Sequence, residues 1–244
     1  VVGILVAPPP VSPRLFGLFS VVGAFREGER FQQGVEWEQR PLDTPGIVAF
    51  DDLCKQVSNE PGVGRLFEDA VAFRVTHGVE CTPVGETAAE MEARAVSRLV
   101  SWEEKDVEHT VWSSATPKLV DGAAPGVVDD AVAIAQAEAF AASWNMQGVI
   151  HMPVGVAARM ADKGLVKVNG RQLTTKMLTP VVAGAGYDTP HLVVTGAVFI
   201  YRSEAYTDAA FDMGMNNREV FASRDYLVVF DTVSRLVIGV APVA

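Results

Sequence analysis

Apolar residues recur at a regular four-residue spacing from Met91 to Leu99, with polar residues filling the positions between them. This pattern predicts an amphipathic helix over residues 88 to about 111. Thr87 followed three residues later by Glu90 is typical of a capping box at the start of a helix. At roughly 25 residues and 1.5 Å per residue, this helix would be about 37 Å long, which favours a subunit with an extended, plate-like form.

Downstream of a Ser/Thr/Pro/Gly-rich linker at 113–126, expected to be a hinge, the pattern predicts a second helix and several strands. The alanine-rich stretch from 129 or 130 to 144 is expected to be helical, and residues 154–163 form a short helix that Gly164 ends. A hairpin is expected over 166–178 around the Asn169-Gly170 turn. Further strands are expected at 70–76, 149–152, 181–183, 193–201, 226–231 and 236–240, the last two as an antiparallel pair around a turn at 232–235.

The first 60 residues are interrupted by prolines and have no long periodic segment. Short apolar groups at 15–22 and 46–50 are expected to be strands between these breaks. Two interpretations stay open: an arm that lies on a neighbouring subunit, and an ordinary loop-rich start to a globular domain.

The chain has 244 residues, of which 49% are hydrophobic and 20% charged, enough for one large domain or two lobes with cores of their own. The formal net charge of −10 argues against a protein that recognises nucleic acid through a basic face. An acidic wall is still compatible with a container for DNA. No apolar run is long enough for a membrane span, and the apolar start is too short for a signal peptide, so we expect a soluble protein made inside a cell.

The residue types that usually carry chemistry are scattered. Cys54 and Cys81 are interpreted as reduced thiols, with a disulfide as the alternative. The four histidines do not fall at metal-ligand spacing, and His151, at the end of an expected buried strand, is interpreted as a hydrogen-bonded core or interface residue. The neighbouring carboxylates, among them Glu103-Glu104, are attributed to solvated helix faces or helix starts. We therefore predict no catalytic residue, no cofactor and no metal site.

Two segments are candidates for contacts between subunits. Gly184 and Gly186 lack the third glycine of a dinucleotide loop, so we expect a tight loop, with Tyr187, at the tip of a lobe where several subunits approach. In the C-terminal region, two interpretations of the polar residues stay open: turn and strand-edge chemistry, and pairing across a symmetric subunit contact. The residues concerned are Asn216, Asn217, Arg218, Arg224 and Asp231.

From about residue 71 to the end, the order of elements resembles that of tailed-phage major capsid proteins with the Hong Kong 97-type fold, particularly those of actinobacterial hosts. The resemblance rests on the long helix at 86–112, the helix–strand–helix unit at 127–163 and the run VVAGAGY at 181–187. It also includes the arginines Arg218 and Arg224, which lead into the strand YLVVFD at 226–231.

This resemblance implies an α+β fold with a long spine helix, an axial lobe and a peripheral lobe. Residues 1–65 would form the N-terminal arm and extended loop, residues 66–119 and 206–244 the peripheral lobe with the spine helix, and residues 120–205 the axial lobe. The implied function is a major capsid protein, found in the virion and assembled in the bacterial cytoplasm, whose hexamers and pentamers close into an icosahedral shell around double-stranded DNA held non-specifically.

Scaffold, portal or cement proteins are implied as further partners. Some family members cross-link a loop lysine to a neighbour's asparagine. Here Lys55 is the one lysine before residue 105, and we predict no cross-link. The chain is short for such capsids, so an encapsulin-like shell or a dedicated penton subunit also fits the pattern. A tail or connector protein fits it as well, and so, from a different class, does an enzyme or ligand-binding protein with an α/β core at about 127–200.

Overall fold

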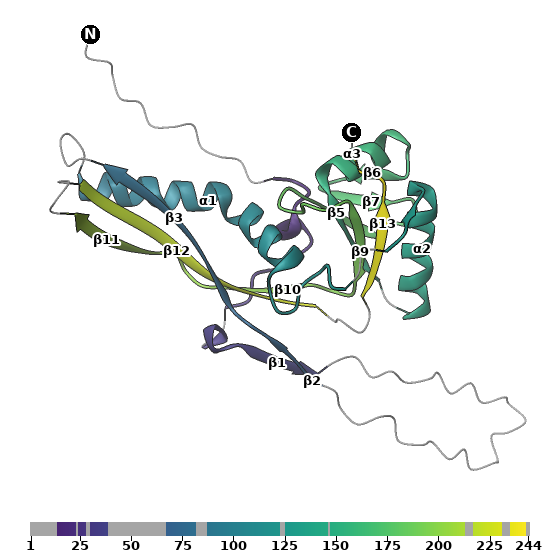
Figure 1. Cartoon of the computed structure of the whole chain (residues 1–244), viewed down its shortest axis with the longest axis horizontal. Helices are drawn as coiled ribbons and strands as arrows, with labels where there is room; N and C mark the ends of the chain where they lie inside the picture. Colours follow the sequence, from purple (N-terminus) through teal and green to yellow (C-terminus); the bar gives the residue numbers. More distant parts are fainter. Residues whose placement is uncertain are drawn as a thin grey trace, which may run out of the picture.

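One long helix lies along a four-stranded β-sheet and ends near a separate seven-stranded sheet in the computed structural model of the chain (Figure 1). The structure describes residues 14–22, 24–27, 30–38, 67–81, 87–122, 125–145, 147–212, 217–230 and 235–242. The molecule is elongated, with a four-stranded sheet and the first part of the helix at one end and a seven-stranded sheet with two further helices at the other.

The long helix is α1, Ala88–Ser113. Its capping box is confirmed: the Thr87 hydroxyl accepts a hydrogen bond from the Glu90 amide, and the Glu90 carboxylate accepts one from the Thr87 amide at 2.7 Å. These bonds satisfy amides that a helix start otherwise leaves unpaired. The side of α1 that carries Met91 and Leu99 is fully buried, as the four-residue spacing predicts.

The four-stranded sheet is built around its longest strand. Antiparallel partners flank this strand on both sides, and α1 packs on the face that presents Val220, Ala222 and Tyr226. The strands are β3 (Phe73–Cys81), β10 (Phe199–Arg202), β11 (Tyr206–Asp212) and the long β12 (Asn217–Val229). A small antiparallel pair, β1 (Val35–Glu38) and β2 (Phe67–Ala70), lies near the end of β12 with the short 3-10 turn η2 (Phe31–Gln33), where Phe31 packs with Leu227 and Val229.

The seven-stranded sheet is mixed and has the order β4-β13-β9-β5-β8-β7-β6. Its strands are β4 (Val127–Val128), β5 (Val149–Pro153), β6 (Val166–Asn169), β7 (Gln172–Thr175), β8 (Pro180–Gly184), β9 (His191–Thr195) and β13 (Leu236–Val240). Helix α2 (Asp130–Ser143) packs on the sheet through alanines at four-residue spacing, which allow close approach. Helix α3 (Val154–Asp162) packs through Val156 and Met160.

Several local predictions are confirmed. The 166–178 segment contains the β6–β7 hairpin, and Gly170 has the positive φ of 62° that its turn requires. Gly164 ends α3 with a φ of 67°. The linker after α1 packs back onto the helix, because the amides of Leu119 and Val120 donate to carbonyls in its last turns.

Three strand predictions are wrong. β12 and β13 do not pair with each other: β12 belongs to the four-stranded sheet, whereas β13 pairs with β9 in the seven-stranded sheet. The single strand expected at 193–201 is two strands, β9 and β10, one in each sheet. The apolar group at 15–22 contains the 3-10 turn η1 (Leu18–Ser20) instead of a strand. The predictions for 46–50, Cys54, Lys55 and Asp231 fall outside the described residues.

Candidate functional site

The second half of α1 carries four carboxylates that contact other segments of the chain: Asp106 lies 2.6 Å from Nε2 of His77 in β3, and the other three are Glu103, Glu104 and Glu108. Glu103 is 6% exposed and Glu108 is 1% exposed, while Glu104 is half-buried. Glu103 continues the buried spacing of Met91 and Leu99, so its position in the apolar stripe was the signal that sequence reasoning missed. The prediction that Glu103 lies on a solvated helix face is therefore wrong: it is buried and paired.

Glu108 connects α1 to two distant segments. One of its carboxylate oxygens accepts a hydrogen bond from the Leu18 amide at 2.9 Å. The other oxygen accepts from the amides of Ala185 at 2.6 Å and Gly186 at 3.0 Å. Burial raises the pKa of Glu108, and these three donors act in the opposite direction because they stabilise the ionised form. One side chain thus holds the N-terminal segment, the loop after β8 and the helix together. We call the region where these three segments meet, around Glu104 and Glu108, the junction.

Glu104, one helical turn earlier, holds the same N-terminal segment. Its carboxylate accepts a hydrogen bond from the Phe19 amide at 2.9 Å. Burial, with a smaller contribution from the neighbouring Glu108 charge, raises the pKa of Glu104 to about 7, although the hydrogen bond from the Phe19 amide acts in the opposite direction. A Cβ atom at Gly17 would overlap the Glu104 carboxylate, so the chain reaches this position because the residue is glycine. Glu104 is therefore a group in this junction whose charge changes near neutral pH.

Glu103 fixes α1 to the central strand of the four-stranded sheet. One of its oxygens accepts hydrogen bonds from the Arg224 guanidinium at 2.6 Å and from the Tyr226 hydroxyl at 2.7 Å. Burial, and then the nearby Glu103 charge, raise the pKa of Tyr226. The Nε of Arg224 is buried and has no hydrogen-bond partner in the described structure. Arg224 thus pairs, through its terminal guanidinium nitrogen, with Glu103 of the same chain.

Aromatic packing completes the junction on the side of the seven-stranded sheet. The ring of Tyr187 stacks on Trp112 of α1 at 4.2 Å between centroids. The Tyr187 hydroxyl lies 3.2 Å from Nδ1 of His151, whose Nε2 lies 3.0 Å from the Thr195 hydroxyl. Burial lowers the pKa of His151 to about 3, so the imidazole is neutral at physiological pH. The prediction of a hydrogen-bonded core histidine is confirmed.

The structure brings Gly184, Gly186 and Tyr187 together at this junction. All three are buried, and a Cβ atom at Gly186 would lie 2.5 Å from the His109 amide nitrogen and overlap the Lys105 carbonyl. The loop thus lies against the backbone of α1, and not at the tip of a lobe as expected from the sequence. The physical reason is the Glu108 carboxylate, which attracts the two amides that follow β8. A contact between these residues and another subunit stays a prediction.

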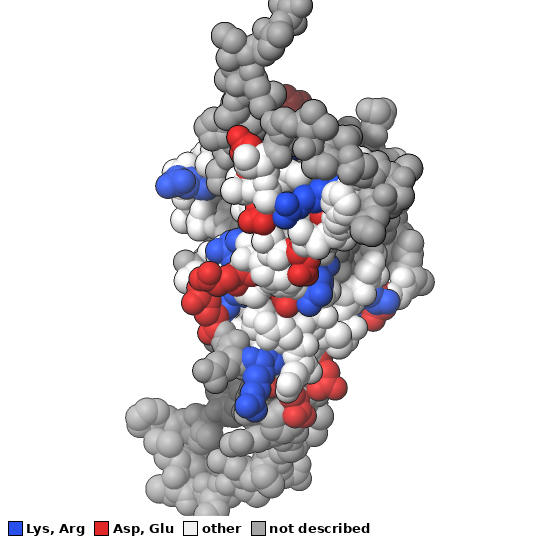
Figure 2. All heavy atoms as spheres, turned by 90° about the vertical axis from the view of Figure 1, so that its left-hand side faces the viewer, with Lys and Arg blue, Asp and Glu red and all other residues white. Residues whose placement is uncertain are grey.

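The C-terminal candidates are spread along β12. Arg218 lies near its start and is partly exposed, in register with Phe211 of β11 and Cys81 of β3. Arg224 lies further along and pairs with Glu103, while Asp231 is outside the described residues. Figure 2 shows the end of the molecule formed by α1 and this sheet, where both signs of charge are interspersed over the described part of the face.

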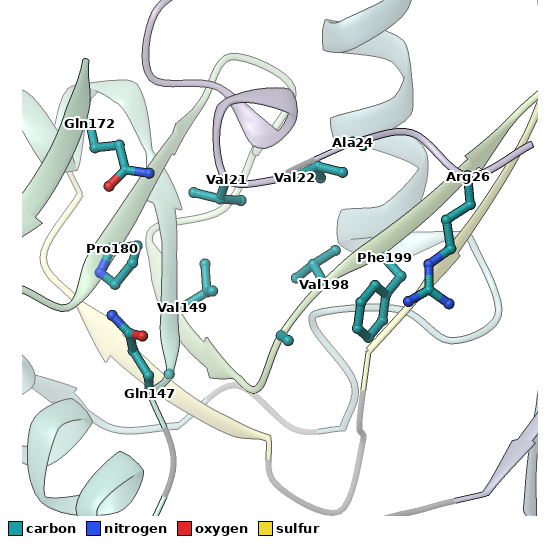
Figure 3. Close-up of a pocket in the computed structure, with 12 residues that line it drawn as sticks. Val21, Val22, Ala24, Arg26, Gln147, Val149, Gln172, Pro180, Val198 and Phe199 are labelled. Carbon is teal, nitrogen blue, oxygen red and sulfur yellow. The ribbon is translucent and has the colours of Figure 1, made fainter.

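A hollow of about 590 Å³ lies between the N-terminal segment and the edges of both sheets (Figure 3). Its lining is mainly aliphatic, including Val22, Val149 and Val198, and Arg26 is the one charged residue among the described residues around it. The Arg26 guanidinium lies over the Phe199 ring at 4.0 Å. His151 and Tyr187 do not line this hollow. It therefore brings together no acid, base and nucleophile from the described chain.

Neither a metal site nor a membrane-spanning helix is found among the residues that the structure describes. They contain no group of three or more His, Cys, Asp or Glu side chains arranged to hold a metal ion. Nor does any of their helices combine the length and the apolar character needed to cross a membrane.

Comparison with known proteins gives similarity of structure without similarity of sequence. No protein-family model matches the chain, and no curated protein sequence is significantly similar to it. Among solved structures, the capsid of an empty GTA particle matches with a TM-score of 0.60 and 11% identity, covering 99% of this chain and 96% of that chain. A structure from Microbacterium phage Oxtober96 matches with a TM-score of 0.57 and 14% identity, covering 98% and 96%.

A third similar structure comes from a bacterial compartment. The holo-SrpI encapsulin complex of Synechococcus elongatus PCC 7942 matches with a TM-score of 0.55 and 7% identity, covering 94% of this chain and 91% of that chain. The matches extend over nearly the whole length of both partners in each pair. The chain therefore has the α+β, Hong Kong 97-type capsid fold, and the predicted resemblance is confirmed at the level of the fold.

Proposed function

We propose that this chain is a major capsid protein that assembles into the icosahedral head shell of a tailed phage and encloses double-stranded DNA. The observation that carries the proposal is the agreement of fold with a capsid over 99% of this chain and 96% of that one. The fold shared with capsid structures takes up nearly all of the sequence, which supports a structural role. We infer a structural role and no catalysis.

The junction at α1 supports this proposal. A subunit repeated many times in a closed shell must present its contact surfaces in a fixed relative orientation. Glu103 ties α1 to β12, and Glu108 ties the same helix to the loop after β8. Buried hydrogen bonds to charged groups resist displacement, because each broken bond leaves an unpaired group away from water. The two sheets are therefore held as one rigid subunit.

The division into lobes remains a proposal, and the sheet pairings favour two changes to it. β10, at 199–202, pairs with β12 and fits the peripheral lobe instead of the axial one. β13, at 236–240, pairs with β9 and fits the axial lobe. The axial lobe would then consist of about 120–195 with 236–240, and the peripheral lobe of α1, β3, β10, β11 and β12.

The partners proposed for the subunit are further copies of itself, as hexamers and pentamers, with scaffold, portal or cement proteins and non-specifically packaged DNA. Its site would be the virion, after assembly in the cytoplasm of a host bacterium. Of the residues proposed for contacts between subunits, Arg218 is favoured by its partial exposure. Arg224, Gly184, Gly186 and Tyr187 would act by shaping the subunit, since their partners described above lie within the chain.

An encapsulin-like shell is the second candidate function, favoured by the match to the SrpI complex. A tail or connector protein would share the self-assembly but form rings or tubes. A ligand-binding protein or enzyme would have to use the hollow beside Arg26, where the described lining offers a single charge.

Electron microscopy and size-exclusion chromatography of the expressed protein, across concentration and salt, test the proposal. Closed shells, or rings of five and six subunits, are the expected result. Open tubes would favour a tail or connector protein. A protein that stays monomeric under every assembly condition, and whose melting temperature rises with a small metabolite, would overturn the proposal in favour of ligand binding.

A further inference from the structure

The loop between β7 and β8 of the seven-stranded sheet exposes two large apolar side chains. Met177 is 75% exposed and Leu178 is 53% exposed. They follow the β6–β7 hairpin, and β6 is the edge strand of the seven-stranded sheet. Val168, in the same hairpin, is 62% exposed. Large apolar side chains that are exposed on a hairpin and on the loop that follows it are typical of a surface that another molecule covers.

Buried hydrogen bonds fix the conformation of this loop. The Thr175 hydroxyl accepts hydrogen bonds from the amides of Met177 and Thr179, both at 3.2 Å. It also donates to the Glu138 carboxylate of α2, which accepts a second hydrogen bond from the Thr179 hydroxyl at 2.7 Å. Thr175 is fully buried. The two apolar side chains are therefore presented by a rigid support instead of a loose connection.

Leu178 has a left-handed backbone conformation, with φ at +68°. A branched side chain is disfavoured there, and strain of this kind persists where surrounding bonds enforce it and is concentrated at functional sites. Packing in the core does not compensate this backbone strain, because more than half of the Leu178 side chain is exposed. Folding of the subunit alone gives no reason for a leucine at this position.

Basic residues lie close in the sequence to the exposed apolar side chains. The stretch from Lys163 to Lys176 contains no Asp or Glu, although the whole chain has a net charge of −10. Lys167, Arg171 and Lys176 are exposed. The rest of the chain is correspondingly more acidic than the whole, with exposed carboxylates such as Asp208 on β11. The edge is thus complementary in charge to the remaining surface of another copy of the chain.

We propose that this apolar–basic edge binds an acidic surface of a second copy of the chain during assembly. We define the edge as Lys167, Val168, Arg171, Lys176, Met177 and Leu178. The inference rests on the proposed self-assembly and adds the surface that drives one of its contacts. A nucleic acid would use the positive charges, but phosphates would leave Met177 and Leu178 uncovered, so a protein partner is favoured.

The test compares two groups of variants with the unaltered full chain. The first is M177S/L178N, because asparagine adopts a left-handed φ with less strain than leucine. We expect the melting temperature of the unassembled subunit to stay the same or rise, and the concentration at which assembly begins to increase at least about tenfold. The second is K167E/R171E/K176E, for which we expect a similar loss of assembly. The matched control is V71S, which removes a valine that is 56% exposed elsewhere on the chain.

Each outcome has a defined meaning. If the unaltered chain never assembles, the proposed function itself fails. If it assembles and the variants assemble at the same concentration, the edge is not a contact and the inference is overturned. A drop in the subunit's melting temperature with M177S/L178N, or an equal loss of assembly in V71S, would also overturn it. So would charge-reversed shells that form normally but no longer retain a double-stranded DNA fragment, since that result assigns the basic residues to nucleic acid.

Discussion

Replacing Glu108 by alanine tests the junction most directly. The substitution removes the acceptor of three main-chain amides, those of Leu18, Ala185 and Gly186. Leu18 and Gly186 are buried, so their amides lose a partner at a site largely removed from solvent. The expected result is a subunit that folds less stably and opens first where the loop after β8 meets the helix.

The magnitude follows from the number of orphaned donors. A buried N–H without a partner costs about 1–3 kcal/mol, and three donors around one carboxylate are coupled, so their costs do not simply add. Removing the carboxylate also removes the unfavourable burial that raises its pKa. We therefore expect a net loss of about 2–4 kcal/mol in the free energy of unfolding. For a chain of this size that corresponds to a fall of about 5–15 °C in melting temperature.

The assay is urea denaturation and thermal melting of the unassembled subunit, with hydrogen exchange at the three amides. The control is Glu92→Ala, which removes a partly exposed carboxylate from the same helix and should change stability by less than about 0.5 kcal/mol. Faster exchange at Leu18, Ala185 and Gly186 is expected in the Glu108 variant alone. If the two variants are equally stable and the exchange rates do not differ, the reasoning about Glu108 is refuted.

Three further changes are informative. Gly186→Ala places a Cβ 2.5 Å from the His109 amide nitrogen and should lower the free energy of unfolding by about 3 kcal/mol. The control is Gly126→Ala, which has open space around the added Cβ and should have the melting temperature of the parent. Equal melting temperatures of the two variants would contradict the steric argument. The pKa of Glu104 is raised from 4.5 to about 7, so the folded subunit holds the proton more tightly and the resulting stability is lost as pH rises through 7. Glu104→Gln should remove about 1 kcal/mol of that pH dependence, allowing for solvent screening. The measurement is the free energy of unfolding in urea at pH 5 and at pH 8. If the difference between the two pH values is the same for both proteins, Glu104 is not the source of the pH dependence. Asp130→Asn leaves Arg159 without its charged partner and should lower the free energy of unfolding by about 3 kcal/mol. Because Arg159 lowers the pKa of Asp130, the parent should lose the stabilisation from this ion pair only at strongly acidic pH. An unchanged melting temperature of the variant at pH 7 would contradict a stabilising role for the pair.

Local chemistry explains which parts of the fold could be predicted from the sequence. The Thr87 capping box, the glycine that ends α3 and the Asn169-Gly170 turn are each determined by a few adjacent residues. These features gave the long helix, the short helix and the hairpin with nearly correct bounds. The order of the elements was enough to identify the fold, because that order is what the similar capsid structures share.

Pairing between distant segments explains what the sequence could not predict. β12 and β13 have the strand pattern of a hairpin, yet β13 finds its partner at β9, more than 40 residues earlier. Glu103 looked like a surface residue because its partners, Arg224 and Tyr226, lie more than 120 residues away. The buried carboxylate of Glu103 follows the spacing of an apolar stripe, and only the tertiary structure reveals the donors that stabilise it there.

The bonds at Glu108 also bear on how a shell made of such subunits would curve. With Gly186 pressed against α1 and Trp112 stacked on Tyr187, the helix cannot tilt relative to the seven-stranded sheet without breaking buried contacts. Five-fold and six-fold rings need different angles between neighbouring copies. In a subunit stiffened in this way, that difference in angle has to be taken up at the seams between copies, so the seams and not the interior of the subunit would determine the radius of the particle.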